Sequence, residues 1–360
     1  MEIIENETMD RIFWNILKGI GIVFVVIGHV CPEEMKFVYL FHLPVFFFVS
    51  GYLYNEDKYG DNPYKLFAAR LKSSWIKYVY ACWFIILMHN FFVRNQMVWL
   101  RGEEYTLVDV ATRMANAMFG DTAEDFANAL WYVPVAVIAI CLLGIIVYFS
   151  RKIYQFTKKT VLKYIFQMMC VLICTLAGYY LEDKQFVLSA HLQVSFVVMP
   201  FLWGGYLLRT SKIQFQRYLN PFIAILCSLL LWITNQHYEL NLATLQVYPY
   251  MHLVAFAGIY VCMYIAKIIR RNIKLCSVFV AFGEASFFIM AIHLPLCRLF
   301  DWAYIKLFYT DRFEELYYVI SSVVFSEKLW PLYLFVGLGL SLCLAHVIKD
   351  LRENISRRIE

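Results

Sequence analysis

Apolar runs of about the length that crosses a lipid bilayer recur along the whole chain. A spanning helix needs about 20 apolar residues, and hydrocarbon leaves a chain few other ways to satisfy its backbone hydrogen bonds. We mark ten candidate spans, which cover 12–31, 37–54, 74–93, 130–150, 163–181, 189–208, 220–236, 247–268, 277–297 and 329–348. The pattern predicts an all-α integral membrane protein with about ten transmembrane helices around a polar central cavity.

Composition agrees with this interpretation, because 61% of the 360 residues are hydrophobic and 16% are charged. Soluble domains average about half apolar and a quarter charged. No Ser/Gly-rich linker divides the chain, so we expect residues 1–360 to form a single membrane domain. The N-terminal segment is acidic, unlike that of a secretory signal peptide, so we expect the first apolar run to remain attached.

Basic residues are unevenly divided between the loops. The loops after even-numbered spans hold more than twice as many Lys and Arg residues as the others. Cytoplasmic loops of membrane proteins carry the excess of Lys and Arg. The asymmetry predicts that both termini are cytoplasmic.

The first span carries two polar side chains on one face. Lys18 and His29 are eleven positions apart, which at about 100° per residue is close to three full turns. They would lie roughly 16 Å apart along the helix axis. Ionisable groups inside a membrane are costly and usually functional. With the N-terminus inside, Lys18 falls in the inner half and His29 near the outer end.

The second span runs back through the membrane and repeats these two polar levels. Counted from the loop, His42 returns to about the depth of His29, and Ser50 and Gly51 return to about the depth of Lys18. The two levels are half a membrane apart. They therefore favour a water-lined path over one compact site.

The ninth candidate span contributes a third wall. We expect one continuous helix there, with His293 in the outer level and Glu284 in the inner half, where it can pair with Lys18. His42 and His293 would then hold the outer level together.

Structural explanations exist for each of these groups. A membrane histidine can simply bond neighbouring helices, Lys18 can extend to the inner surface, and Ser50 and Gly51 can allow close helix packing. Arg70 precedes the third span, where it is either an ordinary cytoplasmic anchor or a contact for an anionic cytoplasmic ligand. The ten cysteines show no zinc-ligand spacing with the histidines, so we expect no metal.

The polar pattern resembles that of the membrane acyltransferase-3 family. Its R/K-x10-H signature, its Phe-His-x-Pro block ending in Ser-Gly, its inner basic segment, its "LWFLP" segment and its late G-x-x-S-x6-H block all have counterparts here. These are Lys18 with His29, then Phe41–Tyr54, Arg70–Tyr78, Leu130–Pro134 and Gly283–His293. The chain departs from the pattern at Lys18, which replaces the commoner arginine, and at Lys77, which replaces the proline of Pro-Tyr.

The resemblance implies a ten-helix O-acetyltransferase of the sugar-modifying, fucose 4-O-acetylase-like branch. The expected donor is cytoplasmic acetyl-CoA, and the expected acceptor is a hydroxyl of a cell-surface or lipid-linked carbohydrate. His29 carries over as the catalytic residue, with Lys18, Ser50 and Gly51 in the signature positions. Arg70 and Lys72 carry over to the donor side. The expected location is a bacterial cytoplasmic membrane, with lipid as a partner, no nucleic acid and no metal.

Two other classes remain open from the sequence. Prolines inside the second and sixth spans suit the discontinuous helices of a polytopic transporter or exporter of a sugar or small polar solute. The paired halves expected of many transporters are not visible. A purely structural membrane partner would leave the buried Lys18 unexplained.

Overall fold

The computed structural model describes residues 2–97, 103–121, 124–184, 191–237, 250–308 and 326–359. The described part of the chain is built from helices and turns, without a strand. The longer helices of the first half are α1 (Glu2–Val30), α3 (His42–Tyr52), α6 (Ile76–Arg94), α8 (Tyr132–Thr157) and α9 (Thr160–Asp183). Those of the second half are α11 (Met199–Thr210), α12 (Pro221–His237), α13 (Tyr250–Ile269), α14 (Ile273–Glu284), α15 (Ser286–Phe308) and α18 (Ser341–Ile359).

The remaining helices join these elements. They are α2 (Pro32–Tyr39), α4 (Glu56–Tyr59), α5 (Pro63–Arg70), α7 (Leu107–Met118), α10 (Leu192–Val197) and α17 (Ser326–Leu334). Two 3₁₀ segments, η3 (Asp125–Trp131) and η5 (Phe215–Arg217), and two π-helical segments, η1 (Leu71–Trp75) and η6 (Phe335–Leu340), complete the described part.

Within the described residues, eight helical stretches are long and apolar enough to cross a membrane, which confirms a multi-pass membrane protein. The second and seventh predicted spans correspond to two shorter apolar helices, Lys36–Tyr52 and Pro221–Gln236. The ninth span is wrong in its bounds. The chain breaks at Ala285, so Glu284 ends α14 while His293 lies on α15, and the long apolar stretch covers Ser286–Phe308.

Short polar side chains set several helix starts outside the apolar stretches. The side chains of Asn55, Asn62 and Asn272 each accept hydrogen bonds from backbone N–H groups in the first turn that follows. Thr106 and Asp109 form a reciprocal capping box at the start of α7. Such caps satisfy N–H groups that have no partner within the helix. The loops thereby fix where the apolar helices begin.

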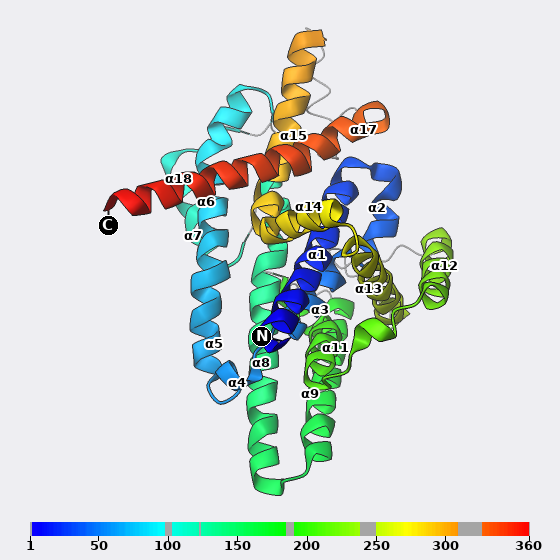
Figure 1. Ribbon diagram of the computed structural model, residues 1–360. Helices are drawn as coiled ribbons and strands as arrows, with labels where there is room; N and C mark the ends of the chain where they lie inside the picture. Colours follow the sequence, from blue (N-terminus) through cyan, green and yellow to red (C-terminus); the bar gives the residue numbers. More distant parts are fainter. Residues whose placement is uncertain are drawn as a thin grey trace.

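Helix α1 lies in the middle of the bundle (Figure 1) and packs against α3, α13, α14 and α15. Glycines allow the closest of these contacts. A Cβ on Gly19 would collide with the carbonyl oxygen of Phe279 in α14, and one on Gly283 would collide with that of Asn15 in α1. Small residues of this kind let membrane helices approach backbone to backbone. The α1–α14 contact is therefore fixed by glycine on both partners.

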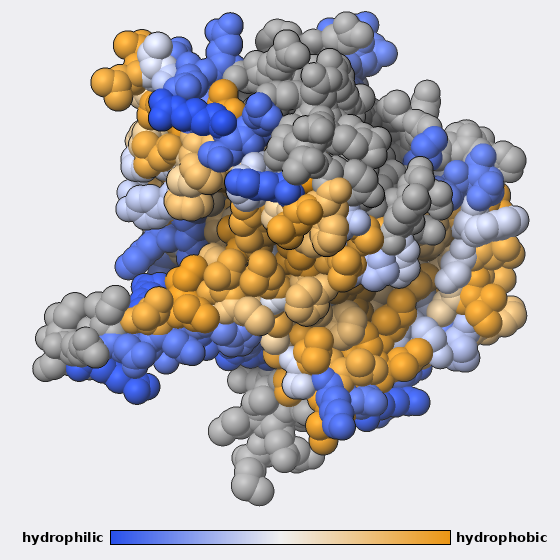
Figure 2. Space-filling model, turned by 90° about the horizontal axis from the view of Figure 1, so that it is seen from above, coloured by the Kyte–Doolittle hydropathy of each residue, from blue (hydrophilic) through white to orange (hydrophobic). Residues whose placement is uncertain are grey.

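The outer surface is strongly apolar. Large side chains such as those of Phe84, Ile173, Phe222 and Phe335 are exposed. Figure 2 shows broad hydrophobic areas on the face seen from above. In water, exposed apolar area of this extent would drive association. It suits a protein whose helices are surrounded by lipid.

Candidate functional site

His29 and His293 meet where α1 packs against α15. Their ring centroids are 5.2 Å apart, with the ring planes inclined by 47°. Nδ1 of His293 is 2.9 Å from the carbonyl oxygen of Ile289 and 3.0 Å from that of Met290. Because carbonyls only accept, Nδ1 carries the proton. Nε2 of this buried ring therefore presents a lone pair, and the described residues provide no hydrogen-bond partner for it.

His42 is held in the same way at the start of α3. Its Nδ1 donates to the carbonyl oxygen of Val38 at 2.8 Å, and its ring stacks on Tyr39 with centroids 4.9 Å apart. His42 and His293 both lie close enough to act electrostatically on His29. The three histidines predicted to share one level therefore do gather there. Both flanking rings have their tautomer fixed by backbone carbonyls.

The other end of the α1 stripe holds Lys18. Its side chain is half-buried, and Glu284 acts on it electrostatically across the α1–α14 contact. Glu284 itself is exposed and accepts a hydrogen bond from Asn15 Nδ2 at 3.4 Å. Lys18 and Glu284 are therefore neighbours, as expected. Glu284 and His293, which were predicted to share one span, belong to two different helices.

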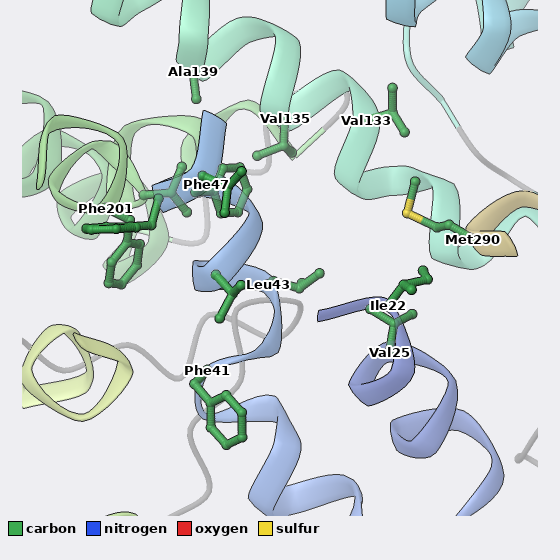
Figure 3. Close-up of a cluster of buried hydrophobic side chains, with 14 of the residues drawn as sticks. Ile22, Val25, Phe41, Leu43, Phe47, Val133, Val135, Ala139, Phe201 and Met290 are labelled. Atoms are coloured by element: carbon green, nitrogen blue, oxygen red, sulfur yellow. The ribbon is translucent and has the colours of Figure 1, made fainter. Parts of the chain in front are cut away.

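A cavity of 190 Å³ lies between these two levels. Its wall includes Ile22, which is on the α1 stripe between Lys18 and His29, but neither Lys18 nor His29 is among the described residues that line it. At the histidine side, the lining residues Leu43 and Met290 are one residue from His42 and one helical turn from His293. Figure 3 shows Ile22 and Met290 near each other, with Leu43 of α3 facing them.

The cavity wall is mostly apolar and carries five polar side chains from four parts of the chain. Ser50 comes from α3, Arg70 and Ser74 come from α5 and η1, Tyr132 comes from α8, and Ser286 comes from α15. None of the lining residues is a carboxylate, an amine or an imidazole. Hydroxyls and one guanidinium in an apolar wall suit a ligand that is largely neutral, such as an amide or an ester, with an anionic end near Arg70.

A π-helical turn begins directly after Arg70. Arg70 and Ser74, four residues apart, both line the cavity, whereas Lys72 between them is exposed and does not line it. Single π turns inside α-helices recur at functional sites. The second π segment, η6, packs against α1 and α15, where Gly337 lies against Val26 and His293. Neither distortion has a signal in the hydrophobic periodicity.

Adjacent residues of α3 have different surroundings. Ser50 lines the cavity, and its hydroxyl lies near that of Tyr132, which lines it too. A Cβ on Gly51 would collide with the carbonyl oxygen of Leu202, while one on Gly205 would collide with that of Phe48. Gly51 therefore allows the close packing of α3 on α11, which is the structural explanation offered above for the Ser-Gly pair. Ser50 lines the cavity instead.

Sequence reasoning missed the roles of three cavity residues. Tyr132 and Ser286 lie inside two of the family-like segments, but nothing in the sequence singled them out as cavity-lining. Ser74 lies four residues after Arg70, and this helical spacing is the signal that could have found it. Within the described residues, no group of three or more His, Cys, Asp or Glu could hold a metal ion.

Comparison with known proteins identifies the family. A family model described as an acyltransferase domain matches residues 11–349, which include every described residue that lines the cavity and all three clustered histidines. Comparisons with curated proteins and with solved structures find no match. Together with the apolar helices, the family match shows that the chain belongs to the acyltransferase-3 family and is a membrane acyltransferase.

Proposed function

We propose that this acyltransferase moves an acetyl group from cytoplasmic acetyl-CoA to a hydroxyl of a cell-surface or lipid-linked carbohydrate. The proposed location is a bacterial cytoplasmic membrane, with both termini inside. The single observation that supports the proposal most is the cavity, whose wall includes Arg70 and also Leu43 and Met290, the neighbours of His42 and His293. A slender, mostly neutral acyl-pantetheine arm matches its size and lining.

On the donor side, Arg70 would contact the phosphates of coenzyme A, since a guanidinium binds phosphate oxygens in pairs. Lys72 is exposed nearby and would add positive charge outside the cavity. The pantetheine arm would pass Ser50, and Lys18 with Glu284 would lie at the same level. Gly51 would contribute indirectly, by holding Ser50 against the cavity through the α3–α11 contact.

On the acceptor side, His29 would act as the general base. It would take the proton of the sugar hydroxyl as that oxygen attacks the thioester carbon. The tetrahedral species would then expel the coenzyme A thiolate, which recovers the proton. His293 and His42, with tautomers fixed by backbone carbonyls, would orient the His29 ring.

The test is acetyl transfer by purified protein in lipid, comparing wild type with His29→Ala. Removing a general base costs about 10²–10⁴-fold in rate. His346→Ala is the matched control, because His346 is exposed on α18 and its Nδ1 bonds only the carbonyl oxygen of its own helix. Transfer that is unchanged in His29→Ala would exclude the histidine mechanism. Uptake of labelled sugar into vesicles without acetyl-CoA would instead favour the transporter.

A further inference from the structure

Acyl transfer from a thioester needs a hydrogen-bond donor for the carbonyl oxygen, because negative charge develops there as the acceptor attacks. The histidines cannot supply it if His29 is the base and the other two accept or orient. The candidates on the cavity wall are the hydroxyls of Ser50, Ser74, Ser286 and Tyr132. These four differ in how firmly the structure holds them.

Tyr132 is the most firmly held of the four. It is the first residue of α8, and its ring packs against Phe47 and Phe46 of α3, with centroids 4.9 Å and 5.8 Å away. Its hydroxyl lies near that of Ser50, one turn further along the same helix α3, and Arg70 acts on it electrostatically. Ring packing fixes the plane of the phenol, and the Ser50 hydroxyl lies near its O–H group.

A fixed donor is worth more than a mobile one, because no reorganisation is needed when charge develops. Serine hydroxyls rotate, whereas a phenol hydroxyl stays in the plane of its packed ring. Ser50 can donate to the Tyr132 oxygen while Tyr132 donates to the substrate, and such chains of hydrogen bonds strengthen each member. Arg70 adds positive charge on the side where the donor's phosphates would bind.

We propose that Tyr132 is a catalytic residue that donates a hydrogen bond to the thioester carbonyl oxygen, with Ser50 as its positioning residue. This proposal rests on the proposed acetyl transfer. The acceptor oxygen bonds to the carbonyl carbon, its proton moves to His29, and the carbonyl becomes an oxyanion bonded by the Tyr132 O–H. The carbon–sulfur bond then breaks, the carbonyl re-forms, and the thiolate takes the proton from His29. No proton leaves Tyr132.

The primary test is Tyr132→Phe, which removes only the hydroxyl. We expect kcat to fall by about 10²–10³-fold, the loss seen for one oxyanion donor, with KM for acetyl-CoA nearly unchanged. Tyr54→Phe is the matched control. The Tyr54 hydroxyl is buried without a hydrogen-bond partner among the described residues and does not line the cavity, so wild-type turnover is expected.

Two further variants keep the test decisive if Tyr132→Phe folds poorly. A fluorinated tyrosine at position 132 is a stronger hydrogen-bond donor and should change kcat without changing acetyl-CoA binding. Ser50→Ala should lower kcat by less than Tyr132→Phe, and the double variant should be no worse than Tyr132→Phe alone. A kcat insensitive to both changes at position 132, or a loss expressed only in KM, would overturn the assignment.

The same assay separates this inference from the proposed function. If wild type transfers acetyl and His29→Ala does not, while Tyr132→Phe retains wild-type kcat, only the role of Tyr132 is refuted. If wild type transfers no acetyl group, or His29→Ala is fully active, the proposed mechanism fails and the role of Tyr132 fails with it.

Discussion

A buried ion pair in α15 allows a prediction whose sign is not obvious. Arg298 is 4% exposed and Asp301 is 0% exposed, and Arg298 Nη1 lies 3.7 Å from Asp301 Oδ2. The Tyr333 hydroxyl donates to Asp301 Oδ1. Nε and Nη1 of Arg298 are buried without hydrogen-bond partners among the described residues. The pair thus links α15 to α17 with one of its two charges poorly satisfied.

The effect of substituting Arg298 or Asp301 depends on how the attraction between the two charges compares with the cost of burying them. Two unit charges about 4 Å apart attract by about 4 kcal/mol at an effective dielectric constant of 20. Burial costs several kcal/mol for each ion. The attraction therefore does not offset both burial terms. Removing one partner forfeits the attraction and leaves the other charge buried, a loss of about 3–5 kcal/mol, whereas replacing both removes the burial terms as well.

We therefore expect Arg298→Met and Asp301→Asn to destabilise the protein strongly as single variants, and the double variant to be more stable than either. Asparagine keeps an oxygen that can accept from Tyr333. The measurement is thermal unfolding in detergent at one scan rate, since unfolding of such proteins is often irreversible. A double variant that loses the sum of the two single effects would refute the reasoning.

The exposed ion pair Arg94–Glu104 provides the control. Its atoms approach to 2.6 Å, closer than the buried pair, but the side chains are 66% and 46% exposed. Exposed pairs of this kind contribute about 0–1 kcal/mol. Arg94→Met should therefore have little effect on the melting temperature, which would show that burial, not distance, sets the cost.

Two further predictions concern helix packing and pH. Gly51→Ala should lower stability by about 1–3 kcal/mol through its clash with the α11 backbone, whereas Gly339→Ala, which meets only a movable phenylalanine ring, should be neutral or stabilising in the same melts. Burial alone would raise the pKa of Glu56, but hydrogen bonds from Lys163 and Tyr206 hold that pKa below its ordinary value of 4.5. Its stabilisation is therefore present at neutral pH and is lost as the pH falls below about 4.5, so the advantage of wild type over Glu56→Gln in melting temperature should shrink there. A difference independent of pH would count against this pairing.

Hydrophobic length and helical periodicity are local properties, and they predicted much of the fold. The apolar runs located the helices, and the eleven-residue spacing of Lys18 and His29 placed both on the stripe of α1 that also carries the cavity residue Ile22. Counting from the loop brought His42 to the level of His29. These expectations required only that the first helix be straight and that a short turn connect it to the second.

The features that escaped prediction depend on contacts between distant segments. The break at Ala285 occurs where α14 lies directly on α1, a contact that requires Gly283 against the Asn15 backbone. The π turn at Leu71–Trp75 lies between α5 and α6, and periodicity at 3.6 residues per turn cannot anticipate it. A water-lined path was expected between the two polar levels, although the apolar middle of the stripe counted against a continuous one. Instead Val25 and Val26 are buried in the apolar core, and a separate cavity lies beside Ile22.

The separation of cavity and histidines bears on how the proposed transfer would proceed. An acyl-histidine intermediate requires bonding contact between the thioester carbon and an imidazole nitrogen. Leu43 and Met290 line the cavity near the histidines, and His29 is not among the described residues of its wall. An acceptor hydroxyl placed between the thioester carbon and the His29 ring would reach both. It would receive the acyl group from the thioester and give its proton to His29. The geometry therefore favours direct transfer to the acceptor over a covalent relay through the histidine.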